Sequence, residues 1–260
     1  MQTNLFDLKS GEETGKKVTT TFTSSNATIY RKVSRSKIEL FRNCPRCFYF
    51  DLKMGIGRPP GFPFTLNNAV DALLKKEFDI HRIKGTRHPL MEQYGINAVP
   101  LKDAHLKEWQ ENFKGIRFKY EPAHFEVFGA VDDIWLNAQG ELMVVDYKAT
   151  STTRKIDLDD GQNYHDGYKR QIEVYQWLLR KNGYKVSDTG YFVYCNGQKD
   201  KKAFDAKLEF AIEVIKYTGN DKWVEKTLGE MRECLDKNSP PSQDPDCEFC
   251  SYANKINNVA

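Results

Sequence analysis

The amino-acid sequence lacks long apolar runs. No segment approaches the roughly 18 consecutive apolar residues that a membrane-spanning helix needs, so we expect no membrane anchor. The first residues, MQTNLFDLKSGEETG, also lack the basic and then continuously apolar pattern of a secretory signal peptide. These two absences lead us to expect a cytoplasmic protein that has no membrane partner.

The sequence also lacks a Gly-rich phosphate loop and an internal repeat, and its net charge is small. There is no Gly-rich phosphate loop, which places a small-molecule phosphohydrolase low among the candidate functions. There is no internal repeat. The formal net charge is only +3. This mild charge neither requires nor excludes a nucleic-acid partner, because binding depends on a local patch rather than on the sum.

The composition is that of a soluble globular protein. Hydrophobic residues make up 40% of the chain and charged residues 29%, which leaves ample apolar material for a core. Residues 1–30 are rich in Thr, Ser, Lys and Glu, and we predict that they form a flexible tail. Residues 31–260 are expected to fold as a single domain.

The order of patterns along the chain predicts an α/β, or α+β, fold. One helix is expected from Ser36, with Glu39 completing a capping box, and another from an N-cap at Thr65. The second helix carries apolar residues at helical spacing: Leu66, Val70, Leu73, Leu74 and Phe78. Residues 118–136 and 141–150 are β-rich and flank the turn NAQG, which predicts an antiparallel hairpin. A helix, two strands and a helix follow, so we expect a central mixed sheet flanked by helices.

Four of the six Cys form two C-x-x-C pairs. Cys44 and Cys47 lie in CPRC, and Cys247 and Cys250 lie in CEFC. In a reducing compartment such pairs indicate a metal or redox site rather than structural disulfides. Four thiolates suit either a tetrahedral Zn²⁺ ion or an iron–sulfur cluster. The other two Cys, at 195 and 234, are expected to be small core residues.

The segment VVDYKAT, residues 144–150, carries an unusual set of charges for a strand. Side chains alternate along a strand, so Asp146 and Lys148 point the same way. Asp132 or Asp133, on the preceding strand, can face Asp146 across the hairpin. Two facing carboxylates repel one another unless a cation lies between them, and Mg²⁺ is a natural candidate. A metal and a nearby Lys suit hydrolysis of a phosphodiester, although the segment alone also permits an ion pair on a solvated face.

Three motifs in order resemble the PD-(D/E)XK nuclease superfamily, and specifically its RecB-like branch. GAVDDIW contains Gly129 and Asp132, VVDYKAT contains Asp146 and Lys148, and QIEVY contains Gln171 and Tyr175. The resemblance implies a restriction-endonuclease-like core. It also implies that Asp132 and Asp146 bind Mg²⁺ or Mn²⁺ and that Lys148 is the catalytic lysine. Gln171 and Tyr175, which share a helix face, would line the active site or the DNA path.

One position departs from the RecB-like pattern. Members of that branch tend to have G-x-x-x-H on an upstream helix, where this chain has Asn67 and Asp71. Asp71 is a hard oxygen ligand that could hold Mg²⁺ or Mn²⁺, and it could equally be an exposed helix residue. The four Cys also depart from the branch, which commonly has one Cys near the N-terminus and three near the C-terminus around an iron–sulfur cluster. The resemblance favours iron–sulfur and the C-x-x-C spacing favours zinc, so both stay open for a metal site that joins the two ends of the domain.

Basic and aromatic residues near these motifs suggest nucleic-acid contacts. Lys169 and Arg170 precede Gln171 and are the first candidates for neutralising phosphates. Weaker candidates are Arg154, Lys155, Lys199, Lys201 and Lys202 for phosphates, and Tyr164, His165 and Tyr168 for stacking on bases. The leading hypothesis is a Mg²⁺- or Mn²⁺-dependent deoxyribonuclease in DNA repair, recombination or defence. The alternative is a catalytically silent nucleic-acid-binding module that keeps the fold, which the Asp71 departure supports.

Overall fold

The structure is a computed structural model that describes residues 29–257. The predicted flexible tail, residues 1–30, lies almost wholly outside the described residues, as do residues 258–260. The helices are α1 (Arg35–Asn43), α2 (Pro45–Met54), α3 (Thr65–Lys84), α4 (Pro89–Gln93), α5 (Leu106–Trp109), α6 (Asn163–Lys181), α7 (Trp223–Asp236), α8 (Glu248–Asn257) and the 3₁₀ turn η1 (Glu121–Ala123). The strands are β1 (Arg31–Ser34), β2 (Ala98–Pro100), β3 (Ile116–Tyr120), β4 (Phe125–Gly129), β5 (Asp133–Asn137), β6 (Leu142–Thr150), β7 (Thr189–Gly197) and β8 (Phe210–Thr218).

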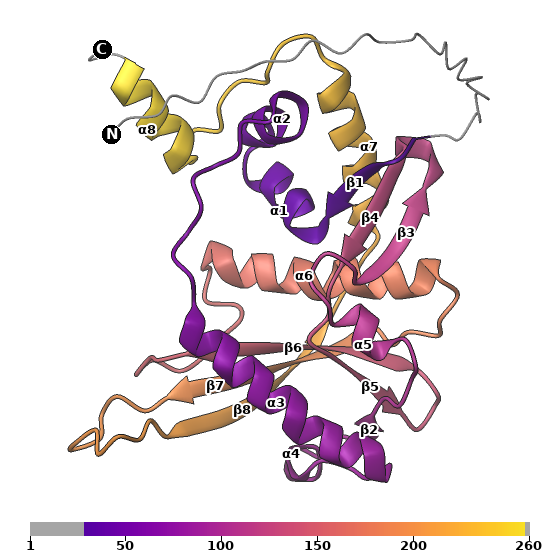
Figure 1. The fold of residues 1–260 in the computed structure, drawn as a ribbon, viewed down its shortest axis with the longest axis vertical. Helices are drawn as coiled ribbons and strands as arrows, with labels where there is room; N and C mark the ends of the chain where they lie inside the picture. The colour runs from indigo at the N-terminus through magenta and orange to yellow at the C-terminus, as the bar shows by residue number, and fades with distance from the viewer. Residues whose placement is uncertain (1–28, 258–260) are drawn as a thin grey trace, which may run out of the picture.

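The strands form two sheets. The larger sheet has the order β2-β5-β6-β7-β8, and the smaller has the order β1-β4-β3. In the larger sheet β5 and β6 form the expected antiparallel hairpin, β6 and β7 run parallel, and β7 and β8 run antiparallel. This mixed sheet with helices around it confirms the fold class expected from the sequence (Figure 1). Within residues 29–257 no helix is long and apolar enough to span a bilayer.

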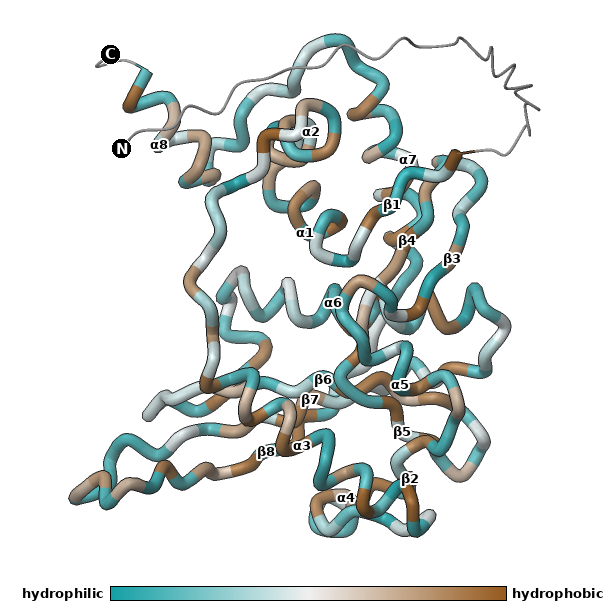
Figure 2. Tube along the Cα trace, viewed as in Figure 1, coloured by the Kyte–Doolittle hydropathy of each residue, from teal (hydrophilic) through white to brown (hydrophobic). Residues whose placement is uncertain are grey.

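Helices α6 and α3 cover opposite faces of the larger sheet. Val144 of β6 packs in a core cluster with Ile172 of α6, whereas Val145 packs in a second cluster with Phe78 of α3. The alternation of neighbouring side chains between two apolar layers explains the hydrophobic strands of this sheet, seen for example at β5 in Figure 2. Helices α1, α2 and α7 and the smaller sheet lie on the α6 side (Figure 1). The face of β6 that carries Val144 therefore looks toward α6.

Two predicted helix starts differ from the structure. The capping box of Ser36 and Glu39 is wrong, because Ser34 is the N-cap of α1 and Glu39 accepts two hydrogen bonds from Arg170 instead. A bidentate, charge-assisted pair is stronger than a reciprocal cap, so the long-range partner takes the carboxylate. Helix α3 includes Thr65 as its first residue, after an N-cap at Phe64.

The apolar pattern of α3 is only partly buried. Leu74 and Phe78 lie in the core, while Leu66 and Leu73 are 57% and 63% exposed. One stripe of the helix therefore contacts the sheet, and apolar residues outside that stripe face solvent.

The predicted β-rich segment 118–136 is divided between the two sheets. It contributes β3 and β4 to the smaller sheet and β5 to the larger one. The chain crosses from one sheet to the other at residues 130–132, immediately after Gly129. Asp132 therefore lies in this crossing segment rather than in a strand, and its side chain can turn toward β6.

Candidate active site and four-cysteine site

Asp132 is held beside β6 by a backbone hydrogen bond. The N–H of Tyr147 donates to Oδ2 of Asp132 at 2.8 Å, and Oδ1 takes no part in this hydrogen bond. Burial, and then the negative charge of Asp146, raise the pKa of the Asp132 carboxyl to about 7. The charges of Lys148 and Lys75 act in the opposite direction and lower this pKa.

Asp146 and Lys148 project together from β6, as the alternation predicts. Asp146 is fully buried, and Lys148 Nζ lies 2.5 Å from its Oδ2. Neither Asp146 oxygen has a hydrogen-bond partner of acceptable geometry among the described residues. Burial works to lower the pKa of Lys148, but the charges of Asp146 and Asp132 outweigh it and raise that pKa. Lys148 is therefore an ammonium at neutral pH.

Lys148 is positioned by two residues of α6. Its Nζ lies 3.5 Å from Oε1 of Gln171 and 4.2 Å from the centroid of the Tyr168 ring. The amide nitrogen of Gln171 in turn donates to the hydroxyl of Tyr175 at 3.3 Å. Tyr175 is buried beneath the site, so it supports Gln171 and does not face the cavity.

Gly129 brings the strand motif and the helix motif into contact. A Cβ at this position would stand 2.6 Å from Cε1 of Tyr175 and 3.3 Å from Cβ of Arg35. Only glycine lets the α6 helix approach the end of β4 so closely.

Asp71 reaches the same region from α3, together with a lysine that sequence reasoning missed. Lys75, one turn further along the helix, has its Nζ 2.9 Å from Oδ2 of Asp71 and 3.9 Å from Oδ1 of Asp132. Lys75, Asp71, Asp132, Lys148 and Gln171 all line a cavity of about 700 Å³. The predicted acids thus meet, but an internal cation lies between Asp71 and Asp132.

The carboxylates fit a hard divalent cation. Asp146 offers two buried oxygens that make no well-aligned hydrogen bond, although Lys148 Nζ lies 2.5 Å from one of them, and Oδ1 of Asp71 is likewise buried without a hydrogen-bond partner. Carboxylate oxygens are the ligands that Mg²⁺ and Mn²⁺ prefer. Within residues 29–257 the three acids do not form a close mutual group, because Lys75 separates Asp71 from the others.

Asp133 points away from this cavity. It lies fully buried on the α3 face of the sheet, where its Oδ1 is 2.6 Å from Nη2 of Arg82. Its Oδ2 accepts a hydrogen bond from the Tyr147 hydroxyl at 2.9 Å. Adjacent acids thus serve opposite faces, and Asp133 acts as a structural anchor for α3.

The predicted nucleic-acid contacts are placed unevenly. Lys169 pairs with Asp159 at 2.6 Å, and Arg170 makes two hydrogen bonds with Glu39. His165 is buried and bonds to Asp160, so stacking on a base through this residue is wrong. Of the two tyrosines predicted to stack on bases, Tyr164 is exposed and Tyr168 is partly exposed, so both rings are accessible to a ligand. Three lysines, at 199, 201 and 202, line a separate cavity beside the β7–β8 connection.

The four paired Cys come together from the two ends of the described chain. Their four Sγ atoms all lie within 4.8 Å of one another, and Cys47 Sγ is 3.6 Å from Cys247 Sγ and 3.7 Å from Cys250 Sγ. Cys44 Sγ lies 3.8 Å from Cys250 Sγ. All four side chains are buried, and Cys195 and Cys234 are buried apart from them. This clustering confirms the predicted joining of the two ends.

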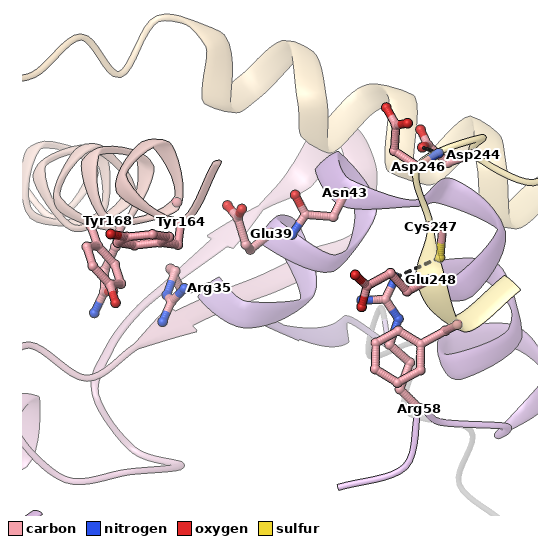
Figure 3. Close-up of a pocket in the computed structure, with 13 residues that line it drawn as sticks. Arg35, Glu39, Asn43, Arg58, Tyr164, Tyr168, Asp244, Asp246, Cys247 and Glu248 are labelled. Carbon is pink, nitrogen blue, oxygen red and sulfur yellow. Dashed lines mark hydrogen bonds between the residues drawn. The ribbon is translucent and has the colours of Figure 1, made fainter. Parts of the chain in front are cut away.

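The surroundings of the cluster favour negative sulfur at Cys44 but not at every thiol, because burial raises the pKa of Cys47 and of Cys250. Burial works to raise the pKa of the Cys44 thiol, but the backbone N–H groups of Cys47 and Asp244 lower it to about 7. Nη2 of Arg58 donates to Cys247 Sγ at 3.4 Å, and its guanidinium lies over the Phe249 ring (Figure 3). Four thiolates near a cation and backbone donors are suited to a metal ion.

Comparison with known proteins assigns the fold to a family. The family model of the PD-(D/E)XK nuclease superfamily matches residues 32–254. A crystal structure named "Putative exonuclease" from Eubacterium rectale is 15% identical, with a TM-score of 0.38, and covers 92% of this chain and 94% of its own. The structure of the protein SSO0001 is 16% identical, with a TM-score of 0.34, and covers 86% of this chain and 84% of its own. A search of curated proteins found no match. The family match covers most of the sequence, and the chain therefore belongs to the PD-(D/E)XK nuclease superfamily.

Proposed function

We propose that this chain is a Mg²⁺- or Mn²⁺-dependent deoxyribonuclease of the RecB-like branch. One observation carries the proposal: the buried Asp146 carboxylate and the Lys148 ammonium, 2.5 Å apart, lie beside Asp132, which lines a cavity of about 700 Å³ together with Lys148. Placing two acids close together in a buried site costs folding free energy, which a bound cation offsets, so such a site is a candidate for function.

The chemistry of this proposal is phosphodiester hydrolysis. Asp132 and Asp146 would hold the ion, which supplies positive charge at the phosphoryl oxygens and favours deprotonation of the attacking water. Lys148 stays protonated and stabilises negative charge that develops on the phosphate. Gln171 and Tyr168 help to keep the Lys148 ammonium in place, since both contact it.

The test is cleavage of linear and circular DNA, in single- and double-stranded form, with Mn²⁺ or Mg²⁺. Lys148→Ala is expected to lose at least about a hundredfold in rate, as removal of a charge-stabilising donor does, while its circular dichroism spectrum is unchanged. Lys185→Ala, a surface change, is the matched control and should cleave normally. Wild-type activity in Lys148→Ala would exclude the proposed role. Comparison of linear with circular DNA separates end-dependent from internal cutting.

A catalytically silent DNA-binding module is the second candidate, and Lys75 favours it. This lysine already neutralises Asp71 and lies near Asp132, so a protein that had lost its metal could keep the fold. That module would bind DNA in a salt-sensitive way. It would not cleave DNA, whichever divalent metal is added. Cleavage by the wild-type protein in Mn²⁺ eliminates this candidate.

We also propose that the four-Cys site holds one Zn²⁺ ion rather than an iron–sulfur cluster. Four thiolates placed tetrahedrally around one zinc at its usual bond length are about 3.8 Å apart. The distances of 3.6, 3.7 and 3.8 Å between Sγ atoms support a single ion. A cluster holds its thiolates on different iron atoms and so spreads them further.

Metal analysis of anaerobically purified protein tests the zinc proposal. We expect one zinc per chain and no brown chromophore, with zinc lost in Cys247→Ser and retained in the control Cys195→Ser. Iron with acid-labile sulfide would overturn it.

The single domain of residues 31–260 is supported by the family match over residues 32–254, and limited proteolysis tests it. The cytoplasmic location and the role in repair, recombination or defence stay predictions.

A further inference from the structure

Arg35 is a half-buried cation without a partner. It is the first residue of α1, and its guanidinium makes no hydrogen bond or ion pair with any residue in the described range 29–257. A guanidinium carries five N–H donors and is always charged. The Arg35 donors that no protein acceptor takes are therefore free for water or for a ligand.

The natural protein partner of Arg35 is already occupied. Glu39 lies one helical turn along α1, at the spacing of an i,i+4 ion pair. Both Glu39 oxygens instead accept from Arg170, at 2.8 and 2.9 Å. Arg170 thus draws the carboxylate away, and Arg35 stays open to the cavity. Figure 3 shows Arg35 between Tyr168 and Glu39.

Arg35 stands where two cavities meet. One is the candidate active site of about 700 Å³, which contains Asp132 and Lys148. The other has a volume of about 570 Å³ and extends toward the four-Cys site. Both are lined by Arg35, Tyr168 and Gln171, so a chain-like ligand at the acids can reach Arg35 without leaving the groove.

The position of Arg35 is fixed by the elements that build the active site. Its Cβ is 3.3 Å from where a Cβ on Gly129 would stand, next to Tyr175. The Arg35 side chain therefore starts beside the Asp132 segment, which directly follows Gly129. Its planar guanidinium donor suits a two-oxygen anion within reach of that point.

The charges beyond Arg35 limit how many phosphates can bind. Asp244, Asp246 and Glu248 line the far part of the second cavity, where their three acids outnumber the single charge of Arg58 (Figure 3). Their carboxylates would repel a strand that continued in that direction. One phosphate at the junction is favoured, and a second phosphate further along is not.

We propose that Arg35 binds the phosphate next to the scissile phosphodiester, on the same DNA strand. This inference rests on the proposed nuclease function and refines it, because the substrate must then carry a phosphate beyond the cleaved bond. The Arg35 contact is distinct from the pairing of Arg170, which holds Glu39 and does not face the groove.

The experiment measures binding of a fluorescein-labelled single-stranded oligonucleotide with Ca²⁺ in place of Mn²⁺, over a series of salt concentrations. The Arg35→Gln variant is expected to bind roughly tenfold more weakly, as loss of a charged hydrogen-bond pair does. Its salt slope should fall by about 0.7, the contribution of one phosphate contact on a single strand. Arg35→Lys keeps the charge and should retain the slope while it loses part of the affinity. Lys32→Gln, an exposed change on β1, is the control and should bind as the wild type does.

The outcomes separate the inference from the proposed function. Binding by Arg35→Gln within about twofold of the wild type, with an unchanged salt slope, overturns the phosphate site. If Lys148→Ala still cleaves DNA normally, the proposed function fails whatever Arg35 does. Loss of cleavage in Lys148→Ala with normal binding in Arg35→Gln removes only the Arg35 site. If the wild type binds no oligonucleotide, the Arg35 site is overturned, whereas the proposed function is still decided by the cleavage assay. Thermal denaturation monitors folding, and an unstable Arg35→Gln leaves Arg35→Lys to decide through affinity.

Discussion

The ring of Tyr175 packs directly against the backbone of Gly129. A methyl group at residue 129 would meet the ring at 2.6 Å, which real contacts do not allow. The end of β4 and the face of α6 are therefore locked together at a single point. This contact fixes the position of α6 relative to β4, and so the position at which Gln171, one turn before Tyr175, contacts Lys148.

Substitution of Gly129 is expected to disturb both stability and catalysis. In Gly129→Ala the added methyl pushes α6 away from β4, and such overpacking costs about 1–3 kcal/mol of unfolding free energy. Cleavage should slow as well, because Gln171 moves with Tyr175. Urea unfolding and cleavage rates measure the two effects. The control Gly57→Ala, where a methyl meets no atom within 4 Å, should leave both unchanged. Equal stability of the two variants would contradict the packing argument.

Removal of the internal cation should strengthen metal binding. In Lys75→Met the ammonium that lies 3.9 Å from Oδ1 of Asp132 is lost, and the site becomes more negative. An increase in Mn²⁺ affinity of roughly fivefold is expected, which corresponds to about 1 kcal/mol for a partly exposed charge pair. Electron paramagnetic resonance of free Mn²⁺ measures it. The neighbouring exposed change Lys76→Met is the control, and weaker Mn²⁺ binding in Lys75→Met would show that Lys75 supports the site.

Asp132 should make metal binding depend on pH. Burial, together with the charge of Asp146, raises its pKa to about 7, so below that pH the carboxyl is protonated and neutral. A cation must then displace this proton, and Mn²⁺ affinity should fall by about tenfold for each pH unit below 7 and level off above it. Isothermal titration calorimetry in buffers of different ionisation enthalpy counts the released proton. Retention of the same pH dependence in Asp132→Asn would assign the proton to another group.

The buried pair of Arg82 and Asp133 should be important for stability. Loss of one partner leaves an uncompensated buried charge, and Arg82→Met is expected to cost about 3–5 kcal/mol of unfolding free energy. The double change Arg82→Met with Asp133→Asn should recover much of this loss. Urea unfolding measures the free energy of unfolding of the wild type, the single variant and the double variant, with the exposed Arg154→Met as a control. A double variant no more stable than the single one would show that packing, not charge, is responsible.

The hairpin and its acids could be predicted from the sequence because their pattern is local. Strand alternation places Asp146 and Lys148 on one side, and the short NAQG turn sets β5 against β6. The structure does place Asp132 near Asp146, although by way of the crossing segment rather than within a strand. Which of the two adjacent acids faces the site follows from that crossing.

The cations of the site could not be predicted, because long-range packing selects them. Lys75 resembles any helix lysine until Phe78 docks α3 on the sheet beside Trp135. Lys169 and Arg170 were favoured for their closeness to Gln171 in sequence, yet acids from other segments pair with both. Arg35 is open only because Arg170 occupies Glu39, and these two partners are 131 residues apart.

The four-thiolate cluster also constrains when the protein can mature during synthesis. Cys47 and Cys247 are 200 residues apart, so the second knuckle leaves the ribosome long after the first. A nascent chain cannot complete the ligand set until almost all of β1 through α7 has emerged. Metal loading would then follow translation of the nuclease core, and a chain interrupted before residue 247 would carry half a site. Under the zinc proposal, the metal content of a preparation would consequently report the fraction of chains that extend past residue 250.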